Sequence, residues 1–250
     1  MLDINSLVFL LLVGLGAMVQ TITGFAMGLI IMGGVTALGL APLAETAAVV
    51  SVISLVNTLV ALRRCHKLIN FAYVRLIAAT LLPALIAGVL ILDYFVADYY
   101  DNLRMLLGGV IVSAGILLML TPAPYQAPSG PGVKMFAGLT AGLMGGMYGA
   151  GGAPLAYLMY RQPLAVNVVR ASLLFLFSLS TSGRMLVVGF SGQINSNIVL
   201  LSLLAIPLVI LVTILTARIN HLLPDALVRR FVFVLLILLG LFLLSGLGLG

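Results

Sequence analysis

Apolar runs follow one another along almost the whole chain, and this feature constrains the fold more than any other. Several of them reach the roughly 20 residues that a helix needs to cross the hydrocarbon core of a bilayer. Hydrophobic residues make up 63% of the 250 residues, and charged residues 7%. Soluble domains carry roughly 25% charged residues, so the composition excludes an ordinary soluble fold. We therefore predict a single all-α, polytopic membrane domain over residues 1–250.

The two halves of the sequence match at one constant offset. Gly24 corresponds to Gly149, Asn70 to Asn195, Arg104 to Arg229 and Gly115 to Gly240, each pair 125 positions apart. Self-similarity of this kind indicates an internal repeat. We predict repeat 1 over residues 1–120, a linker over 121–132 that is rich in proline, and repeat 2 over 133–250.

Each repeat contains five apolar segments. The expected segments are 7–20, 24–40, 44–62, 71–92 and 102–120, then 133–148, 149–160, 166–189, 196–217 and 226–247. Prolines such as Pro42, Pro83, Pro163 and Pro224 are expected mostly at the joints, because proline cannot continue a helix. Asn70 and Asn195 are expected to cap the helices that follow them.

Charge predicts that the two repeats have opposite orientations. The loop RRCHK, Arg63 to Lys67, is basic and should be cytoplasmic, whereas the next loop contains Asp93 and Asp98 and no basic residue. In the second half the charge pattern of the corresponding loops is reversed: loop 189–195 is uncharged and loop 218–230 is basic. The sequence thus predicts inverted-topology repeats in the plasma membrane, the inner membrane in a bacterium, with the amino terminus outside.

The first two segments of each half are too short to cross a bilayer. Segment 149–160 would cover only about 18 Å of a core roughly 30 Å thick. We predict that each pair forms a broken or re-entrant hairpin, with the first break near Gly24 and the second within GGMYGAGGAP, 145–154. Broken backbone at membrane depth is tolerated only where protein or a water-filled cavity surrounds it.

The two breaks favour an anion site. Glycine lets the backbone approach a ligand, and the amides at a helix start carry partial positive charge. Two helix starts brought together by a pseudo-two-fold axis would bind an anion without a basic side chain. The alternative is that Gly24, Gly28, Gly149, Gly151 and Gly152 only permit close helix packing, the role that we expect for Gly14, Gly108, Gly109, Gly138 and Gly142.

The same residues carry a family resemblance. VQTITGFAMGLIIMGG in the first half and AGLMGGMYGAGGAPLAYL in the second resemble the glycine-rich signatures of the TauE/SafE family of sulfite exporters and organosulfonate permeases. The resemblance covers nearly the whole chain. The first signature differs from the family pattern, with threonine at 21 and 23 and Phe25 and Ala26 where members often carry more glycine. The resemblance implies transport of a small sulfur-containing anion such as sulfite or an organosulfonate.

The eighth segment contains two arginines, Arg170 and Arg184, on nearly the same helical face. Arginine inside a spanning helix usually faces a cavity or a partner, although these two would also fit side chains that extend to opposite membrane surfaces. The candidate substrate-binding residues are Gln20, Thr21, Thr23, Gly24, Phe25, Tyr148, Gly149, Ala150, Gly151, Gly152, Ser178, Thr181 and Arg184.

Three residues are candidates for coupling or gating: Glu45, Asn57 and Arg170. Glu45 occupies the repeat position of Arg170 and could carry a coupled H⁺ or pair with Na⁺. The alternative is that it complements the dipole at a helix start. Asn57 lies on a polar face of the third segment that matches the polar face of the eighth.

Other functions need features that this sequence lacks. An intramembrane enzyme needs a nucleophile with a base, or a metal set, and no apolar run contains histidine or cysteine; His66, His221 and the lone Cys65 lie in loops. We expect no enzyme activity, no metal and no cofactor. Most basic residues lie near the ends of apolar runs, which argues against nucleic-acid binding despite the net charge of +6. The alternatives to a secondary transporter are a passive anion channel and a transporter of another carboxylate or oxyanion. The coupling ion and the oligomeric state stay open.

Overall fold

The computed structural model describes residues 4–119, 125–192, 195–219 and 225–245, except for the side chains of 117–118 and 225–229. Within these residues the chain forms ten α-helices and one 3₁₀ helix and no strand. The elements are α1 (Ile4–Thr23), α2 (Met27–Ala37), α3 (Leu43–Leu62), η1 (His66–Leu68), α4 (Phe71–Phe95), α5 (Tyr100–Met119), α6 (Pro131–Tyr148), α7 (Gly152–Tyr160), α8 (Val166–Phe190), α9 (Ser196–Ile219) and α10 (Asp225–Leu244).

Among the described residues, five helices, α1, α3, α4, α8 and α9, are long and apolar enough to cross a membrane. The expectation of a short first segment was therefore wrong, since α1 continues to Thr23. Its polar end stays helical because the hydroxyls of Thr21 and Thr23 donate to the carbonyls of Ala17 and Val19, one turn back. α2 and α7 are short, as expected, with 11 and 9 residues.

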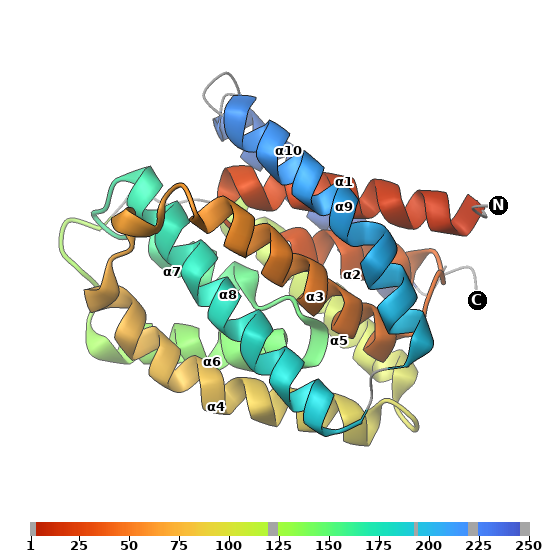
Figure 1. Ribbon diagram of the computed structural model, residues 1–250. Coiled ribbons are helices and arrows are strands. Elements are labelled where there is room, and N and C mark those ends of the chain that lie inside the picture. Colours follow the sequence, from red (N-terminus) through yellow and green to blue (C-terminus); the bar gives the residue numbers. More distant parts are fainter. Residues whose placement is uncertain (1–3, 120–124, 193–194, 220–224, 246–250) are drawn as a thin grey trace.

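The helices form one bundle with α3 and α8 packed against each other in its middle (Figure 1). On one side α1 packs against α9, on the other α6 packs against α4, and α5 packs against α10. α3 and α8 run in opposite directions: Arg184, late in α8, donates to Ser51, early in α3, while Ser172, early in α8, accepts from the amide of Asn70, beyond the end of α3.

α5 and α10 also cross in opposite directions, through reciprocal glycine contacts. A Cβ at Gly115 would lie 3.0 Å from the carbonyl oxygen of Phe233, and one at Gly240 would lie 2.8 Å from that of Gly108. Phe233 is the repeat position of Gly108, and Gly240 that of Gly115. The two contacts are therefore equivalent under the 125-residue offset.

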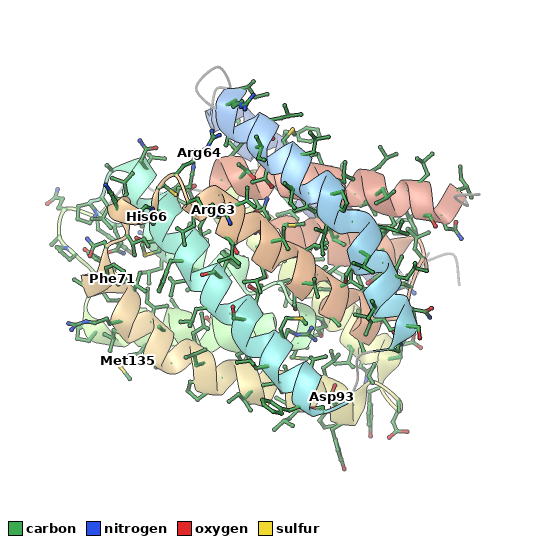
Figure 2. All side chains as sticks on the ribbon, in the orientation of Figure 1. Arg63, Arg64, His66, Phe71, Asp93 and Met135 are labelled. Atoms are coloured by element: carbon green, nitrogen blue, oxygen red, sulfur yellow. The ribbon has the colours of Figure 1, made fainter. Side chains whose placement is uncertain are left out.

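The two ends of the bundle differ in charge. Arg63, Arg64 and His66 lie at one end, where α3 finishes, and Asp93 lies at the other, where α4 finishes (Figure 2). We call the end with Arg63, Arg64 and His66 the basic end and the end with Asp93 the acidic end.

The predicted caps are confirmed: the side-chain oxygens of Asn70 and Asn195 accept from the amides of Tyr73 and Ile198.

Two sequence expectations were wrong in detail. Pro83 lies inside α4 and not at a joint, because α4 runs on to Phe95. Gly109 is not a packing glycine, since a Cβ there would meet nothing within 4 Å. The expectations that concern linker residues 121–124, loop residues 193–194, His221 and Pro224 lie outside the described residues, as does the side chain of Arg229.

Candidate functional site

Both predicted breaks interrupt the helices at the matching glycines. The first break, residues 24–26, separates α1 from α2, and the second, residues 149–151, separates α6 from α7. The backbone turns through the left-handed region at Gly24 (φ +82°), Ala26 (φ +82°) and Gly149 (φ +63°). Glycine adopts this conformation freely, whereas a left-handed alanine is uncommon and needs support from its surroundings. Ala26 is therefore a strained position inside the first break.

The two breaks touch each other, although they are far apart in the sequence. A Cβ on Gly28, in the first turn of α2, would lie 2.3 Å from the carbonyl oxygen of Gly149. A Cβ on Gly152 would lie 3.4 Å from the Cβ of Phe25. The Tyr160 hydroxyl donates to the carbonyl of Thr23, and its ring packs edge-on against Phe25. Glycine at 28 is needed for this approach, whereas the tight neighbour of Gly152 is Phe177 of α8, whose Cζ would lie 2.9 Å from a Cβ there.

The helices that leave the breaks both begin without a side-chain cap. Ala26 and Gly151 are the residues before the first turns of α2 and α7, and neither start has a capping hydrogen bond from a side chain. The first amides of a helix have no intrahelical acceptor and carry the positive end of the dipole. Two uncapped starts side by side form an environment that favours negative charge.

Arg184 brings a buried positive charge to the second break. Its side chain is 2% exposed, and its Nε donates to the carbonyl of Gly146 at 2.8 Å, in the last turn of α6. One terminal nitrogen donates to Ser51 Oγ at 3.2 Å. A Cβ on Gly149 would lie 3.6 Å from the same Oγ, so Ser51 lies between the guanidinium and the break. The Arg184 side chain is directed into the bundle, because its hydrogen-bond partners lie there.

Most residues of the two breaks are packed in the interior. Of the six residues 24–26 and 149–151, five are buried and Gly149 is partly accessible. Gly151 packs against the backbone of α6, because a Cβ there would lie 2.1 Å from the carbonyl oxygen of Ala141. Tyr148 uses its hydroxyl to donate to the carbonyl of Leu103 in α5. Ala150 is 2% exposed. Packing thus accounts for part of the glycine-rich sequence.

The threonines and Gln20 differ in their hydrogen bonding. The Thr23 hydroxyl also contacts the backbone of Phe25 and so supports the first break. Ser178 and Thr181 donate to carbonyls of their own helix, at Phe175 and Phe177. The Gln20 Nε2 is buried and has no hydrogen-bond partner among the described residues. Gln20 lies one turn before Gly24, whose amide donates to its carbonyl.

Asn57 and Thr21 form a polar knot between helices. The Asn57 amide nitrogen lies within hydrogen-bond distance of Thr21 Oγ1 in α1 and Thr213 Oγ1 in α9, at 3.1 and 2.7 Å. Polar side chains that bond across membrane helices contribute about 0.6 kcal/mol on average and up to about 1.7. These contacts tie α1, α3 and α9 together.

Arg170 lies away from Arg184, whereas Glu45 lies beside Asp93 at the acidic end. Glu45 accepts from the Asn195 side chain and, with Asp93, lines a cavity of about 220 Å³ at the acidic end. The Arg170 backbone packs against Gly24, 3.4 Å from a Cβ built there. Fourteen residues of α8 separate the two arginines, about 21 Å along the axis at about 1.5 Å per residue. The structure does not bring Arg170 and Arg184 into one site.

Sequence reasoning missed three contributors to this region: the Gly146 carbonyl, the Thr213 hydroxyl and Tyr160. Backbone carbonyls carry no sequence signal of their own. Thr213 and Tyr160 lie 156 and 137 residues from their partners Asn57 and Thr23. The sequence shows that residues 213 and 160 are polar, but it does not indicate which residue each of them contacts.

Long apolar helices around two buried helix breaks define a multi-pass membrane protein. The chain belongs to the sulfite exporter TauE/SafE family, whose model matches residues 8–243. It is 37% identical over 229 residues to a probable sulfite/organosulfonate exporter TauE of Cupriavidus necator, covering 92% of this chain and 90% of that protein. No solved structure matches the chain.

The family membership confirms the resemblance noted in the sequence. Its members are exporters, so the chain is a membrane transport protein and not an enzyme.

Proposed function

We propose that the protein is a secondary transporter of a small sulfur-containing anion, sulfite or an organosulfonate, bound where the two helix breaks meet. The observation that carries the proposal is the contact between two uncapped helix starts with the buried Arg184 beside it. The name of the Cupriavidus necator relative supports the choice of substrate.

The two halves act as inverted repeats in this proposal. Support comes from the opposite directions of α3 and α8 and from the equivalent contacts of Gly115 and Gly240 across α5 and α10. The packing of α1 against α9 is likewise the counterpart of α6 against α4. Such a pair of halves can alternate between two arrangements that expose a central site to one side and then the other.

An anion at the junction would meet three kinds of donor. The amides that begin α2 and α7 supply partial positive charge, and Arg184 supplies a full one. Gln20 Nε2 supplies a donor that the described protein leaves unused. Because the surroundings are buried, each interaction is stronger than it would be in water. The proposed binding requires no resident cofactor or metal.

The basic end is the cytoplasmic side in this proposal, and the amino terminus lies outside, in a bacterial inner membrane. The charge difference between Arg63, Arg64 and Lys67 at one end and Asp93 and Asp98 at the other supports this orientation. Glu45, beside Asp93 at the acidic end, is then the candidate for coupling to H⁺ or Na⁺ at the outer mouth. Asn57 and Arg170 support the architecture around the breaks.

Flux measurements on purified protein in liposomes test the function. We expect saturable transport of labelled sulfite or an organosulfonate that responds to an imposed H⁺ or Na⁺ gradient. Sulfate, phosphate and a small carboxylate serve as comparison substrates. Flux that rises linearly with substrate concentration would indicate a channel and not a transporter. Preference for the carboxylate would contradict the proposal that the substrate is a sulfur-containing anion.

Arg184→Ala tests the site. Hydrogen bonds to charged groups contribute about 1.5–3 kcal/mol, so we expect sulfite to bind roughly ten-fold or more weakly, measured by thermal-shift titration. Arg184→Lys keeps the charge and separates loss of binding from loss of folding. Arg75→Ala, an exposed residue of α4, is the matched control. Equal sulfite-induced shifts in Arg184→Ala and the parent protein would reject the assignment.

A further inference from the structure

A second cavity, separate from the contact between the breaks, opens between α5, α6 and α7. Its volume is about 330 Å³. It extends from Tyr125, in the linker at the basic end, to Pro154, in the first turn of α7. Phe136 lines it and is 67% exposed, so the cavity opens onto the outer surface of the bundle.

The lining of this cavity offers almost nothing to a polar ligand. Most lining residues are apolar, among them Ala114 of α5 and Met144 of α6. The hydroxyls of Ser113 and Thr140 donate to carbonyls of their own helices, at Val110 and Phe136. An anion would lose its hydration here without compensation. The cavity therefore fits a hydrocarbon chain, and at membrane depth the surrounding hydrocarbon is lipid.

The basic end of the cavity carries a fixed positive charge. The Arg161 guanidinium lies over the rings of Tyr125 and Tyr157, 4.1 and 5.1 Å from their centroids, and both rings line the cavity. One terminal nitrogen donates to the Tyr157 hydroxyl at 2.7 Å. The Nε has no hydrogen-bond partner among the described residues.

Hydrogen bonds from the linker surround Arg161. The Tyr125 amide donates to the Arg161 carbonyl, and the neighbouring Gln162 side chain exchanges hydrogen bonds with Ser129. The linker is thus held against the end of α7, with the guanidinium at the cavity edge. Among the described residues that line the cavity there is no acidic side chain. A ligand that matches both features has an apolar chain and a negatively charged head.

We propose that this cavity binds the acyl chain of an anionic phospholipid from the leaflet at the basic end, with its phosphate at Arg161. The bound chain would reach Pro154 and so contact α7 three residues beyond the second break. The site differs from the proposed anion site in its lining, its mouth and its ligand.

Native mass spectrometry of the purified protein with added lipid tests the proposal without any transport assay. Phosphatidylglycerol and phosphatidylcholine with identical acyl chains are compared. We expect the first bound molecule of phosphatidylglycerol to bind roughly five-fold more tightly than the first molecule of phosphatidylcholine. This is the factor expected for one basic residue near an anionic group. Arg161→Gln should abolish this preference, and Arg161→Lys should retain most of it. Arg75→Gln, a basic residue exposed on α4, should leave it unchanged.

Filling the cavity tests the acyl-chain half of the site. Ala114→Phe should weaken binding of both lipids, whereas Gly109→Phe, on the same helix where a Cβ meets nothing within 4 Å, should not. Ala137→Leu, on α6, replaces Ala114→Phe if that variant does not fold. Equal affinity for the two lipids in the parent protein, or an unchanged preference in Arg161→Gln, would overturn the proposal. Binding of hexanesulfonate without binding of phospholipid would assign the cavity to a substrate tail instead.

Discussion

Single glycines decide how closely the two breaks approach. Gly28 lies in helix α2 and has an ordinary backbone conformation. Only its neighbour, and not its own backbone, therefore requires a residue without a side chain. The Gly149 carbonyl occupies the space that a methyl group would take. Gly24 and Gly149, in contrast, are required by their own positive φ angles. Two physical reasons therefore lead to the same residue type within one site.

Gly28→Ala should separate the breaks. The added carbon would lie 2.3 Å from a backbone oxygen that cannot rotate away, and overpacking of this kind costs about 1–3 kcal/mol. We expect a lower thermal midpoint in detergent and loss of sulfite flux in liposomes. Gly109→Ala adds the same carbon in open space and should keep both values. Parent-like flux in Gly28→Ala would contradict the proposed role of the contact.

At the scale of elements, small residues join α6 to α4. Gly138, Gly142 and Gly146 recur every four residues on one face of α6 and meet the carbonyls of Ile77, Leu81 and Leu85. Lipid is as apolar as leucine, so membrane helices associate through close packing and not through burial from water. This seam holds the end of α6 in place, and with it the Gly146 carbonyl that Arg184 contacts.

Gly142→Leu should break the seam. A Cβ there would lie 2.3 Å from the Leu81 carbonyl oxygen and 2.8 Å from the Cβ of Ala84, so α4 and α6 must move apart. We expect a destabilisation of about 3 kcal/mol or more, seen as loss of the monodisperse peak in size-exclusion chromatography. Gly132→Leu, in the first turn of the same helix with nothing within 4 Å, is the control. A normal peak for Gly142→Leu would show that the seam tolerates a large side chain.

At the scale of the whole molecule, the basic and acidic ends define an axis across the bundle. Cys65 is the only cysteine in the sequence and lies at the basic end, between α3 and η1. Burial raises the pKa of its thiol, an effect that the positive charge of Arg170 partly offsets. Because the thiolate is the reactive form, a raised pKa means slow labelling at neutral pH and faster labelling as the pH rises.

Cys65 can therefore report the orientation of the protein. We expect a membrane-impermeant maleimide to label Cys65 in inside-out vesicles and not in intact cells, with a rate that increases above neutral pH. Asp98→Cys in a Cys65→Ser background places an exposed thiol at the acidic end and should show the opposite sidedness. Labelling of Cys65 in intact cells would reverse the proposed orientation.

Local features of the fold were predictable from the sequence. The helix breaks at Gly24 and Gly149 and the caps at Asn70 and Asn195 follow from residues that act on their own backbone. The end of α1 was missed because Thr21 and Thr23 read as polar interruptions, whereas their hydroxyls bond within the helix. Pro83 was placed at a joint because proline disfavours helix interiors, yet α4 accommodates it.

The sequence alone determined that this chain belongs in a membrane, that its helices break at Gly24 and Gly149, and that its halves share one pattern, because hydropathy and backbone preference depend on neighbouring residues. Tertiary structure alone decided that the two breaks meet, that Arg184 is buried against Gly146 and Ser51, and that Asn57 ties helices together. Those outcomes depend on contacts between residues separated by 36 or more positions, which helix packing creates and local sequence does not encode.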